Sequence, residues 1–389
     1  MRILGIVAEY DPFHRGHLYH LTEAVRRVSP DFIFVVLSPC VKQRGELSLL
    51  SPTDRARCAL EAGADAVFSL PVLWTVRDAE HYALGAVSLL SGLGITHLAF
   101  GAETADEFLL TRAAHIMENP SPVFSSLLKK HLASGMGYPA ALSAAFSTAF
   151  PETEGLLAQP NNILAVCYLR AIQRLNLPIL PVIIPRTGNY HAAGINPVFP
   201  SASAVRDSLL CGNYAAAFEA VPSYTANLLH HRFLEGHIPD EHILDTILLS
   251  RLRSMSDQEY RLLPDLSEGM ENALHTAATV SRSRKELITL LSGRRYSAAR
   301  ISRLCAAALL GITRNDTEAL PLPDHALLLG LRKRPEMTAL WKSLPVTVIT
   351  SFTEWKKAAA SADLASWQLW AQCAGHPNTL PFTEKLISV

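Results

Sequence analysis

Short apolar segments and amphipathic segments alternate through the first two hundred residues of the chain. Five of the apolar segments are almost uninterrupted by polar residues, as is typical of strands covered on both faces of a parallel sheet. They span residues 3–8, 32–37, 66–70, 97–100 and 179–184. The intervening segments repeat apolar residues at helical spacing, and one of them opens with Ser51 and Pro52 in cap and first-turn positions. The alternation predicts a Rossmann-like α/β domain with a parallel sheet.

Beyond about residue 215 the strand-like segments give way to leucine-rich segments with helical spacing. Prolines separate these segments, among them Pro222, Pro239 and Pro264. The pattern predicts an α/β domain over residues 1–215 and an all-helical domain over residues 216–389. A chain of 389 residues has the length for two such domains.

Composition narrows the classes of protein to which the chain can belong. Its 35 basic and 35 acidic residues give no net charge, so attraction to nucleic acid must come from a local patch. The six cysteines form no C-x-x-C pair, which disfavours a zinc knuckle or a disulfide framework and suits a reducing compartment. The chain shows neither a leader-like start nor about 18 consecutive apolar residues, so a cytoplasmic protein without a membrane span is expected.

Four polar loops follow the predicted strands, at residues 9–17, 38–46, 101–103 and 185–191. Ligands of parallel α/β sheets bind outside the carboxyl ends of the strands, where such loops meet. We therefore expect these loops to converge on one cleft.

The sequence His14-Arg15-Gly16-His17 lies in the first of these loops and opens the first predicted helix. The glycine allows a ligand to approach the backbone closely, and the unpaired amides of a helix start attract anions. Two imidazoles at this place can donate hydrogen bonds to phosphate oxygens, so we interpret the turn as a nucleotide-phosphate cradle. Two other interpretations are a surface turn capped by histidines and a metal-binding pair that lacks a third ligand.

A strand that runs into H-x-G-H at a helix start resembles the signature of the nucleotidyltransferase superfamily. Its members attack the α-phosphate of a nucleotide and release pyrophosphate. Their second signature, S-[ST]-x-[IV]-R, is similar to the sequence SASAVR that ends at Arg206. The pair of motifs is more specific than either motif alone.

A closer resemblance is to the bacterial tRNA(Met) cytidine acetate ligases, whose opening EYNPFHNGHLYH is similar to EYDPFHRGHLYHL at residues 9–21. Further blocks resemble that family in order: KQRGE, FGAE, QPNNIL, PRTGNYH and, in the predicted helical domain, GRRYSAARISRL. The resemblance implies acetylation of the exocyclic amine of the wobble cytidine in elongator tRNA(Met), with acetate first activated by ATP as acetyl-adenylate. It also implies Mg²⁺ as a cofactor, and it assigns no metal to protein ligands.

The resemblance implies site residues by position. His14, His17 and Arg206 would stabilise the charge that develops as pyrophosphate leaves. Arg44 or Arg186 would draw acetate towards the α-phosphate, and a structural salt bridge is an equally open role for either arginine. The positions implied to contact ATP are Val7, Ala8, Glu9, Tyr10, Asp11, Pro12, Phe13, His14, Arg15, Gly16, His17, Leu18, Tyr19, His20, Gly101, Asn161, Arg186, Thr187 and Ser203.

Asp11 departs from the family pattern, which commonly has asparagine before Pro-Phe-His. A carboxylate would add negative charge near the phosphates unless it is turned away, protonated or bound to a metal. Glu9 and Asp11 can also be considered as an acid/base pair, although two carboxylates so spaced on a turn are more often one cap and one solvated group.

Basic residues gather in residues 282–303, where seven basic side chains accompany the single acid Glu286. Such a patch, with a tyrosine for base stacking, suits RNA, and a solvated helical face is the alternative. The candidate RNA-binding residues are Arg282, Arg284, Lys285, Arg294, Arg295, Tyr296, Arg300 and Arg303. A second basic run at residues 332–334 would extend the patch. Trp355, Trp367 and Trp370 are expected in the core.

Two other functions compete with the acetate ligase. A small-molecule adenylyltransferase or cytidylyltransferase would share both signatures, although the long helical segment with its arginines disfavours it. A non-catalytic protein that binds ATP and tRNA would carry the same motifs, with Asp11 as a sign of a decayed site.

Overall fold

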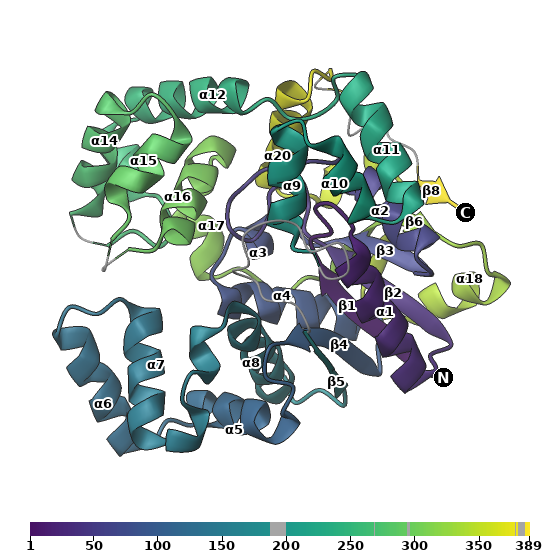
Figure 1. The fold of residues 1–389 in the computed structure, drawn as a ribbon, viewed down its shortest axis with the longest axis horizontal. Helices are drawn as coiled ribbons and strands as arrows, with labels where there is room; N and C mark the ends of the chain where they lie inside the picture. Colours follow the sequence, from purple (N-terminus) through teal and green to yellow (C-terminus); the bar gives the residue numbers. More distant parts are fainter. Residues whose placement is uncertain (187–199, 268, 294–295, 378, 380–385) are drawn as a thin grey trace.

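The computed structural model describes residues 1–186, 200–267, 269–293, 296–377, 379 and 386–389. Its described strands form one eight-stranded sheet with the order β5-β4-β1-β2-β3-β6-β7, and β8 pairs with β6 (Figure 1). The strands are β1 Ile3–Ala8, β2 Phe32–Leu37, β3 Ala66–Ser69, β4 His97–Ala102, β5 Leu180–Pro185, β6 His325–Leu331, β7 Thr347–Ile349 and β8 Ile387–Ser388. The pairs among β1 to β5 are parallel, and β6 joins β3 antiparallel.

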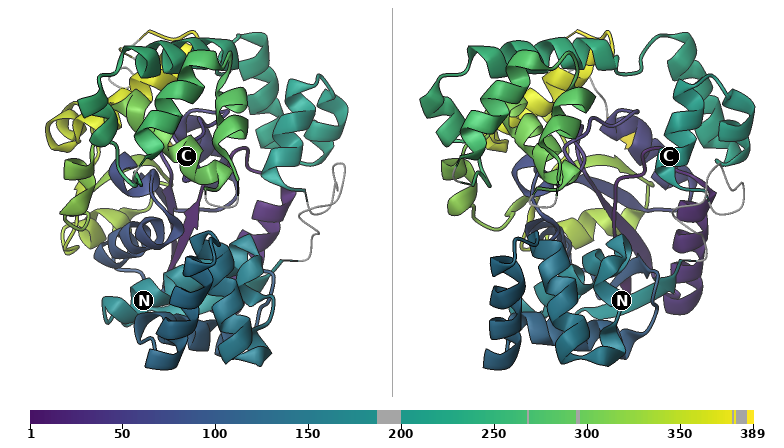
Figure 2. Two further views of the ribbon diagram at one scale, coloured as in Figure 1. Left: turned by 90° about the vertical axis from the view of Figure 1, so that its left-hand side faces the viewer. Right: turned by 60° about the vertical axis from the view of Figure 1, so that its left-hand side comes forward.

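Helices surround this sheet and continue beyond it (Figures 1 and 2). Those in the first half are α1 Arg15–Val28, α2 Pro52–Glu61, α3 Val72–Thr75, α4 Ala79–Gly92, α5 Glu107–Glu118, α6 Pro122–Ala133, α7 Tyr138–Ala149 and α8 Pro160–Arg174. Those in the second half are α9 Ala202–Leu210, α10 Tyr214–Glu219, α11 Ser223–Leu234, α12 Glu241–Ser254, α13 Asp257–Arg261, α14 Met270–Val280, α15 Arg284–Leu291, α16 Ala298–Leu310, α17 Arg314–Glu318, α18 Pro335–Trp341, α19 Phe352–Ala358 and α20 Ser361–Cys373.

The central strands are buried on both faces, as their apolar sequences predict. In β2, Phe34 and Val36 pack in a core with α4 and α8, whereas Val35 and Leu37 pack in a second core with α1 and α2. Alternate residues of a strand point to opposite faces, so a fully apolar strand supplies both cores. The predicted α/β fold class with a parallel sheet is confirmed.

The order of the strands fixes where a ligand can bind. From β1 the chain crosses to β2 on one side, and from β4 it crosses to β5 on the other side, although β1 and β4 are neighbours. This reversal is the switch point of an open α/β sheet, where the loops after two adjacent strands separate and leave a crevice. The H-x-G-H turn follows β1, and Gly101 lies near the end of β4.

The prediction that residues 216–389 are all helical is wrong in its last part. β6, β7 and β8 extend the sheet begun by the first half of the chain, and Leu327, Leu328 and Leu329 of β6 are buried. A leucine run of this length is compatible with a helix as well as with a buried strand, because both bury a continuous apolar segment. The boundary near residue 215 stays a prediction.

Helices α12 to α16 share a further apolar core, formed by residues such as Leu248, Leu274 and Leu304, which also includes Val41 and Val72 of the first half of the chain. Trp367 and Trp370 of α20 and Trp355 of α19 are buried against the sheet, as expected. The six cysteines, all within the described ranges, form no disulfide. In the same ranges no helix combines the length and apolar character needed to cross a bilayer.

Candidate active site

The first turn of α1 is organised by two histidines that cap each other. His14 is the N-cap, and its Nδ1 accepts from the backbone N–H of His17 at 3.3 Å. In return, Nδ1 of His17 accepts from the backbone N–H of His14 at 3.3 Å. The two imidazoles stack with their centroids 3.6 Å apart.

This reciprocal capping decides which nitrogen of each ring carries the proton. A ring nitrogen that accepts a hydrogen bond is unprotonated, so a neutral imidazole must then carry its proton on the other nitrogen. His14 and His17 are therefore Nε2–H tautomers, each with one donor that the cap does not use. The interpretation as capping histidines and the interpretation as phosphate donors thus describe two nitrogens of the same rings.

The histidines of this turn are held in their neutral form. Burial, together with Arg186, lowers the pKa of His14 to about 3 and that of His20 to about 4. Burial and the neighbouring imidazole of His14 also lower the pKa of His17 well below its ordinary value. At neutral pH these rings can therefore donate hydrogen bonds but carry no positive charge.

Aromatic side chains and a glycine hold the histidine pair in place. Tyr10 and Phe13 are buried, and their ring centroids lie 4.9 Å and 5.7 Å from that of His17. A Cβ at Gly16 would lie only 3.0 Å from Cε1 of His14. A side chain at residue 16 would therefore press on the His14 ring and displace it.

Asp11 is turned into the interior of the protein. Its carboxylate is 1% exposed, with Oδ2 2.9 Å from Nζ of Lys42 and Oδ1 accepting from the N–H of Leu49 at 2.6 Å. Burial opposes ionisation, but Lys42 and Arg206 outweigh it and lower the pKa of Asp11 below its ordinary value. Asp11 is therefore neither a solvated group nor a general base in this arrangement.

The second signature meets the first at this carboxylate. Ser201 caps α9, and Arg206 on that helix donates to the carbonyl oxygen of Asp11 at 2.7 Å. Arg206 also lies 3.5 Å from Oδ2 of Asp11 and 3.7 Å from Oε2 of Glu46. Residues almost two hundred positions apart thus form one polar cluster beside the histidine turn.

A second group of site residues gathers after β4. Asn161, in the first turn of α8, donates from Nδ2 to Glu103 at 2.5 Å and accepts from Arg186 at 2.9 Å. Gly101 lies beneath Arg186, because a Cβ there would meet the arginine side chain at 3.2 Å. Arg186 also lowers the pKa of His14 and His17, so this group lies near the histidines of the first loop. That the four loops enclose one cleft stays a prediction.

Comparison with known proteins assigns the chain to a family. The model of the HIGH Nucleotidyl Transferase family matches residues 1–379. A protein of Acetivibrio thermocellus named tRNA(Met) cytidine acetate ligase is 30% identical over 97% of this chain and 96% of its own length. A protein of the same name from Syntrophomonas wolfei is 34% identical over 85% of this chain and 82% of its own length. The chain belongs to the tRNA(Met) cytidine acetate ligase family.

Solved structures of the Thermotoga maritima member TmcAL have the same fold. The apo form superposes with a TM-score of 0.92 at 25% identity, and a form bound with alpha-thio ATP superposes with a TM-score of 0.90 at 24% identity. Each alignment covers 100% of both chains. The additional strands β6 to β8 therefore belong to a fold that the chain shares over its whole length.

The arginines that the family resemblance implied for the site do not all lie beside the histidine turn. Arg186 faces the histidines, whereas Arg44 is exposed and lines a polar pocket together with Arg284. Arg15 is also directed away, since its Nε donates to the carbonyl oxygen of Glu219 at 2.7 Å. Thr187 lies outside the described residues.

Sequence reasoning missed the buried cation Arg55, which the acetate ligase resemblance had not included. Arg55 is fully buried and donates to the carbonyl oxygens of Glu9 at 2.7 Å, Pro39 at 2.5 Å and Leu50 at 3.2 Å. These hydrogen bonds connect the loop after β1 to the loop after β2. The sequence of α2 gave no signal for the burial of Arg55, because Arg57 lies on the same polar helix and is exposed.

The basic run at residues 282–303 does not form a single solvated face. Arg282 and Lys285 are exposed, whereas Arg284 donates to Oγ of Ser302 at 3.2 Å and burial lowers the pKa of Arg303. Tyr296 is half-buried, with the guanidinium of Arg300 5.2 Å from its ring centroid. Arg294 and Arg295 lie outside the described residues.

The second basic run does not extend this patch. Arg332 donates to the carbonyl oxygen of Leu60 at 2.6 Å, and Arg334 lies 3.1 Å from Oδ1 of Asp65. Asp65 precedes β3, so both contacts lie at the amino ends of the parallel strands. The expected extension of the patch is wrong, because β6 runs antiparallel to β3 and carries these arginines to the far end of the sheet.

Proposed function

We propose that this protein activates acetate with ATP and transfers the acetyl group to the wobble cytidine of elongator tRNA(Met). The observation that carries the proposal is the mutually capped pair of His14 and His17, with two Nε2–H donors that the cap does not use, at the switch point of the sheet. Family membership and the ATP analogue bound by the Thermotoga maritima relative support the same function.

In the first step, an oxygen of acetate attacks the α-phosphorus of ATP and the bond to the β-phosphate oxygen breaks. The leaving pyrophosphate takes the bonding electrons, so negative charge grows on the oxygens beyond the α-phosphorus. His14 and His17 would donate to these oxygens, and Arg186 would supply the positive charge near the phosphates. The protein groups position the reactants and take no part in covalent bonds.

In the second step, the exocyclic nitrogen of the cytidine attacks the carbonyl carbon of acetyl-adenylate. The carbon–oxygen bond to AMP breaks, AMP leaves with the bonding electrons, and the nitrogen loses one proton. The exposed Arg282 and Lys285 would contact phosphates of the RNA.

Magnesium would enter as the complex with its substrate ATP. Among the described residues there is no cluster of three or more histidine, cysteine or acidic side chains suited to a metal ion. Mg²⁺ commonly keeps several waters and binds through substrate phosphates, so the donor set of this site fits a nucleotide-borne ion and not a cage of protein ligands.

The test uses purified protein, magnesium-ATP and labelled acetate, with and without a tRNA(Met) transcript. The proposal predicts acetate-dependent release of pyrophosphate and label on the RNA. Pyrophosphate release that ignores acetate would instead identify another adenylyl acceptor, and ATP binding without turnover would identify a binding protein.

Two histidine variants connect the activity to the geometry. His14→Asn keeps a side-chain cap for α1 but removes the Nε2–H donor, so acetate-dependent pyrophosphate exchange should fall by about 10²–10³-fold while the thermal midpoint changes little. His131→Ala on α6 is the control and should leave exchange unchanged. Full exchange activity in His14→Asn would show that the histidine does not serve the phosphate.

A further inference from the structure

A polar pocket of about 320 Å³ lies where the loop after β2 meets helices α12, α15 and α16. We call it the α15 pocket. It contains three carboxylates and three cationic groups, from elements far apart in the chain. These are Glu46, Glu241, Asp245, Arg44, Arg284 and Lys285.

Glu46 makes this pocket a neighbour of the ATP site. Its carboxylate lines the pocket, yet Oε2 also lies 2.9 Å from Nζ of Lys42 and 3.7 Å from Arg206. Lys42 and Arg206 in turn contact Asp11 in the histidine turn. The side chain of Glu46 therefore lies between the α15 pocket and the polar cluster of Asp11, Lys42 and Arg206 beside the histidine turn.

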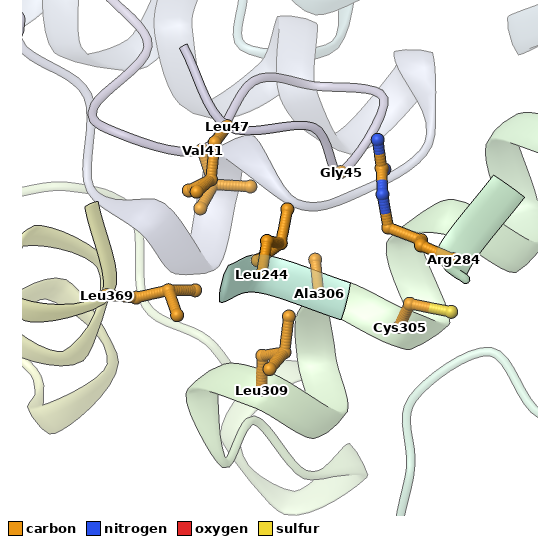
Figure 3. A pocket seen from close by; sticks show the side chains of 9 residues that line it. All are labelled: Val41, Gly45, Leu47, Leu244, Arg284, Cys305, Ala306, Leu309 and Leu369. Carbon is orange, nitrogen blue, oxygen red and sulfur yellow. The ribbon is translucent and has the colours of Figure 1, made fainter. Parts of the chain in front are cut away.

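The loop that carries Arg44 and Glu46 is held in place by close packing against α16. Gly45 has a φ of 76°, and a Cβ there would lie 2.5 Å from the carbonyl oxygen of Ser302, while Oγ of Ser302 donates to the carbonyl oxygen of Gly45 at 3.3 Å. Figure 3 shows apolar side chains of the loop and the helices, among them Leu47, Leu244 and Leu309, converging beside this contact around a space of about 10 Å³. These contacts thus fix the backbone of the loop that carries Arg44 and Glu46.

The carboxylates of the pocket retain acceptor capacity. Asp245 accepts from the backbone N–H of Arg284 through Oδ1 at 2.8 Å, which leaves its second oxygen for another donor. No described cation lies within 4 Å of the Glu241 carboxylate, and likewise no described carboxylate lies within 4 Å of Arg44 or Lys285. The pocket therefore has free hydrogen-bond acceptors on α12 and cationic side chains on the loop after β2 and on α15.

We propose that the α15 pocket receives one extruded nucleotide of the RNA substrate, the acceptor cytidine, and this inference rests on the proposed function. The carboxylates accept from the 4-amino group of the base, as acidic side chains do for cytosine, and the cations bind the adjoining phosphate. The volume suits a nucleotide and far exceeds the needs of acetate. Enzymes that modify a base take it out of the stack into such a pocket.

Uridine gives the pocket a chemical test of its own. It has a carbonyl oxygen where cytidine has the amino group, so a carboxylate that accepts from cytidine would repel uridine. The wild-type protein should bind a tRNA(Met) transcript with cytidine at the wobble position about tenfold or more tightly than the same transcript with uridine, at equal salt.

Two variants address the pocket by independent means. Glu241→Gln removes one acceptor charge, and its matched control is Glu107→Gln, because both residues follow an aspartate N-cap at the start of an exposed helix. Ala298→Trp fills the pocket without removing charge, and its control is Ala140→Trp, at an exposed position in the first turn of α7.

Both pocket variants should keep acetate-dependent pyrophosphate exchange in the absence of RNA. Neither changes the histidine turn or the polar cluster of Asp11, Lys42 and Arg206. They should lose about tenfold or more of acetyl transfer to tRNA and most of the preference for cytidine over uridine in binding. Unchanged transfer and preference in Ala298→Trp would overturn the inference. If the wild-type protein shows no exchange, the proposed function fails, while the binding preference still decides whether this pocket reads the base.

Discussion

Replacing Lys42 by methionine tests whether the buried charges beside the histidine turn stabilise the fold. The lysine side chain is 3% exposed and lies 2.9 Å from Asp11 and 2.9 Å from Glu46. Methionine would fill similar space without charge, and Asp11 would keep only Arg206, at 3.5 Å, as a described cation within 4 Å. Removing one partner of a buried ion pair costs about 3–5 kcal/mol, so we expect the free energy of unfolding to fall by that amount.

The converse change should be milder, and this asymmetry follows from the structure. In Asp11→Asn, Lys42 retains Glu46, and the amide oxygen of asparagine can still accept from Leu49, so the expected loss is about 1–3 kcal/mol. The double variant should be more stable than the sum of the single losses predicts, by about 1–3 kcal/mol. Urea unfolding followed by circular dichroism, without ATP, measures the free energy of unfolding of both single variants and of the double variant. Lys129→Met on the exposed face of α6 is the control.

The pH dependence of the loss identifies its cause. In the wild-type protein the pKa of Asp11 is lowered, so its stabilising contribution is present above the unfolded pKa of about 4 and disappears as the pH falls through the folded pKa. Without Lys42 the burial of Asp11 favours its protonated form, so the loss caused by Lys42→Met should shrink between pH 7.5 and pH 5. A loss below about 1 kcal/mol at pH 7.5, or one that is independent of pH, would refute the reasoning.

Three further substitutions test separate contacts. Gly16→Ala would place a Cβ 3.0 Å from the His14 ring, so pyrophosphate exchange should fall by about tenfold to a hundredfold with little change in the thermal midpoint. Gly45→Ala combines a φ of 76° with a 2.5 Å approach to Ser302, and urea unfolding should show a loss of about 1–3 kcal/mol. Burial raises the pKa of Asp363 to about 6, so its ionisation destabilises the fold as the pH rises from about 4 through that value. Asp363→Asn should therefore flatten the dependence of the thermal midpoint on pH, and above pH 6 the variant should have a higher thermal midpoint than the wild-type protein.

The central sheet could be predicted because its strands are apolar on both faces. β1 and β2 begin and end where the apolar runs do, and the cap Ser51 starts α2 as the sequence indicates. Such signals are local, since a side chain that caps its own helix or a run that fills two cores leaves its mark in a few adjacent residues.

The features that were missed depend on partners distant in the chain. The leucine run of β6 is a strand because β3 offers it an edge about 260 residues earlier, which no local pattern reports. The environment of Asp11 is likewise set by Lys42, in the loop after β2, and by Arg206, in helix α9. Sequence reasoning could name the possible states of this carboxylate, but only the packing of these distant segments selects the buried, paired state.

The charges at the site explain why an aspartate is compatible with a triphosphate there. Asp11 and Glu46 carry two negative charges and Lys42 and Arg206 two positive ones, and distances of 2.9–3.7 Å connect all four, so the charges of these four groups sum to zero. Arg186 is bonded to the neutral amide of Asn161, and no described carboxylate lies within 4 Å of it, so its charge stays available beside the uncharged histidines. The carboxylate of Asp11 is thus balanced inside the protein, and under the proposed function the attraction for phosphate would come from Arg186.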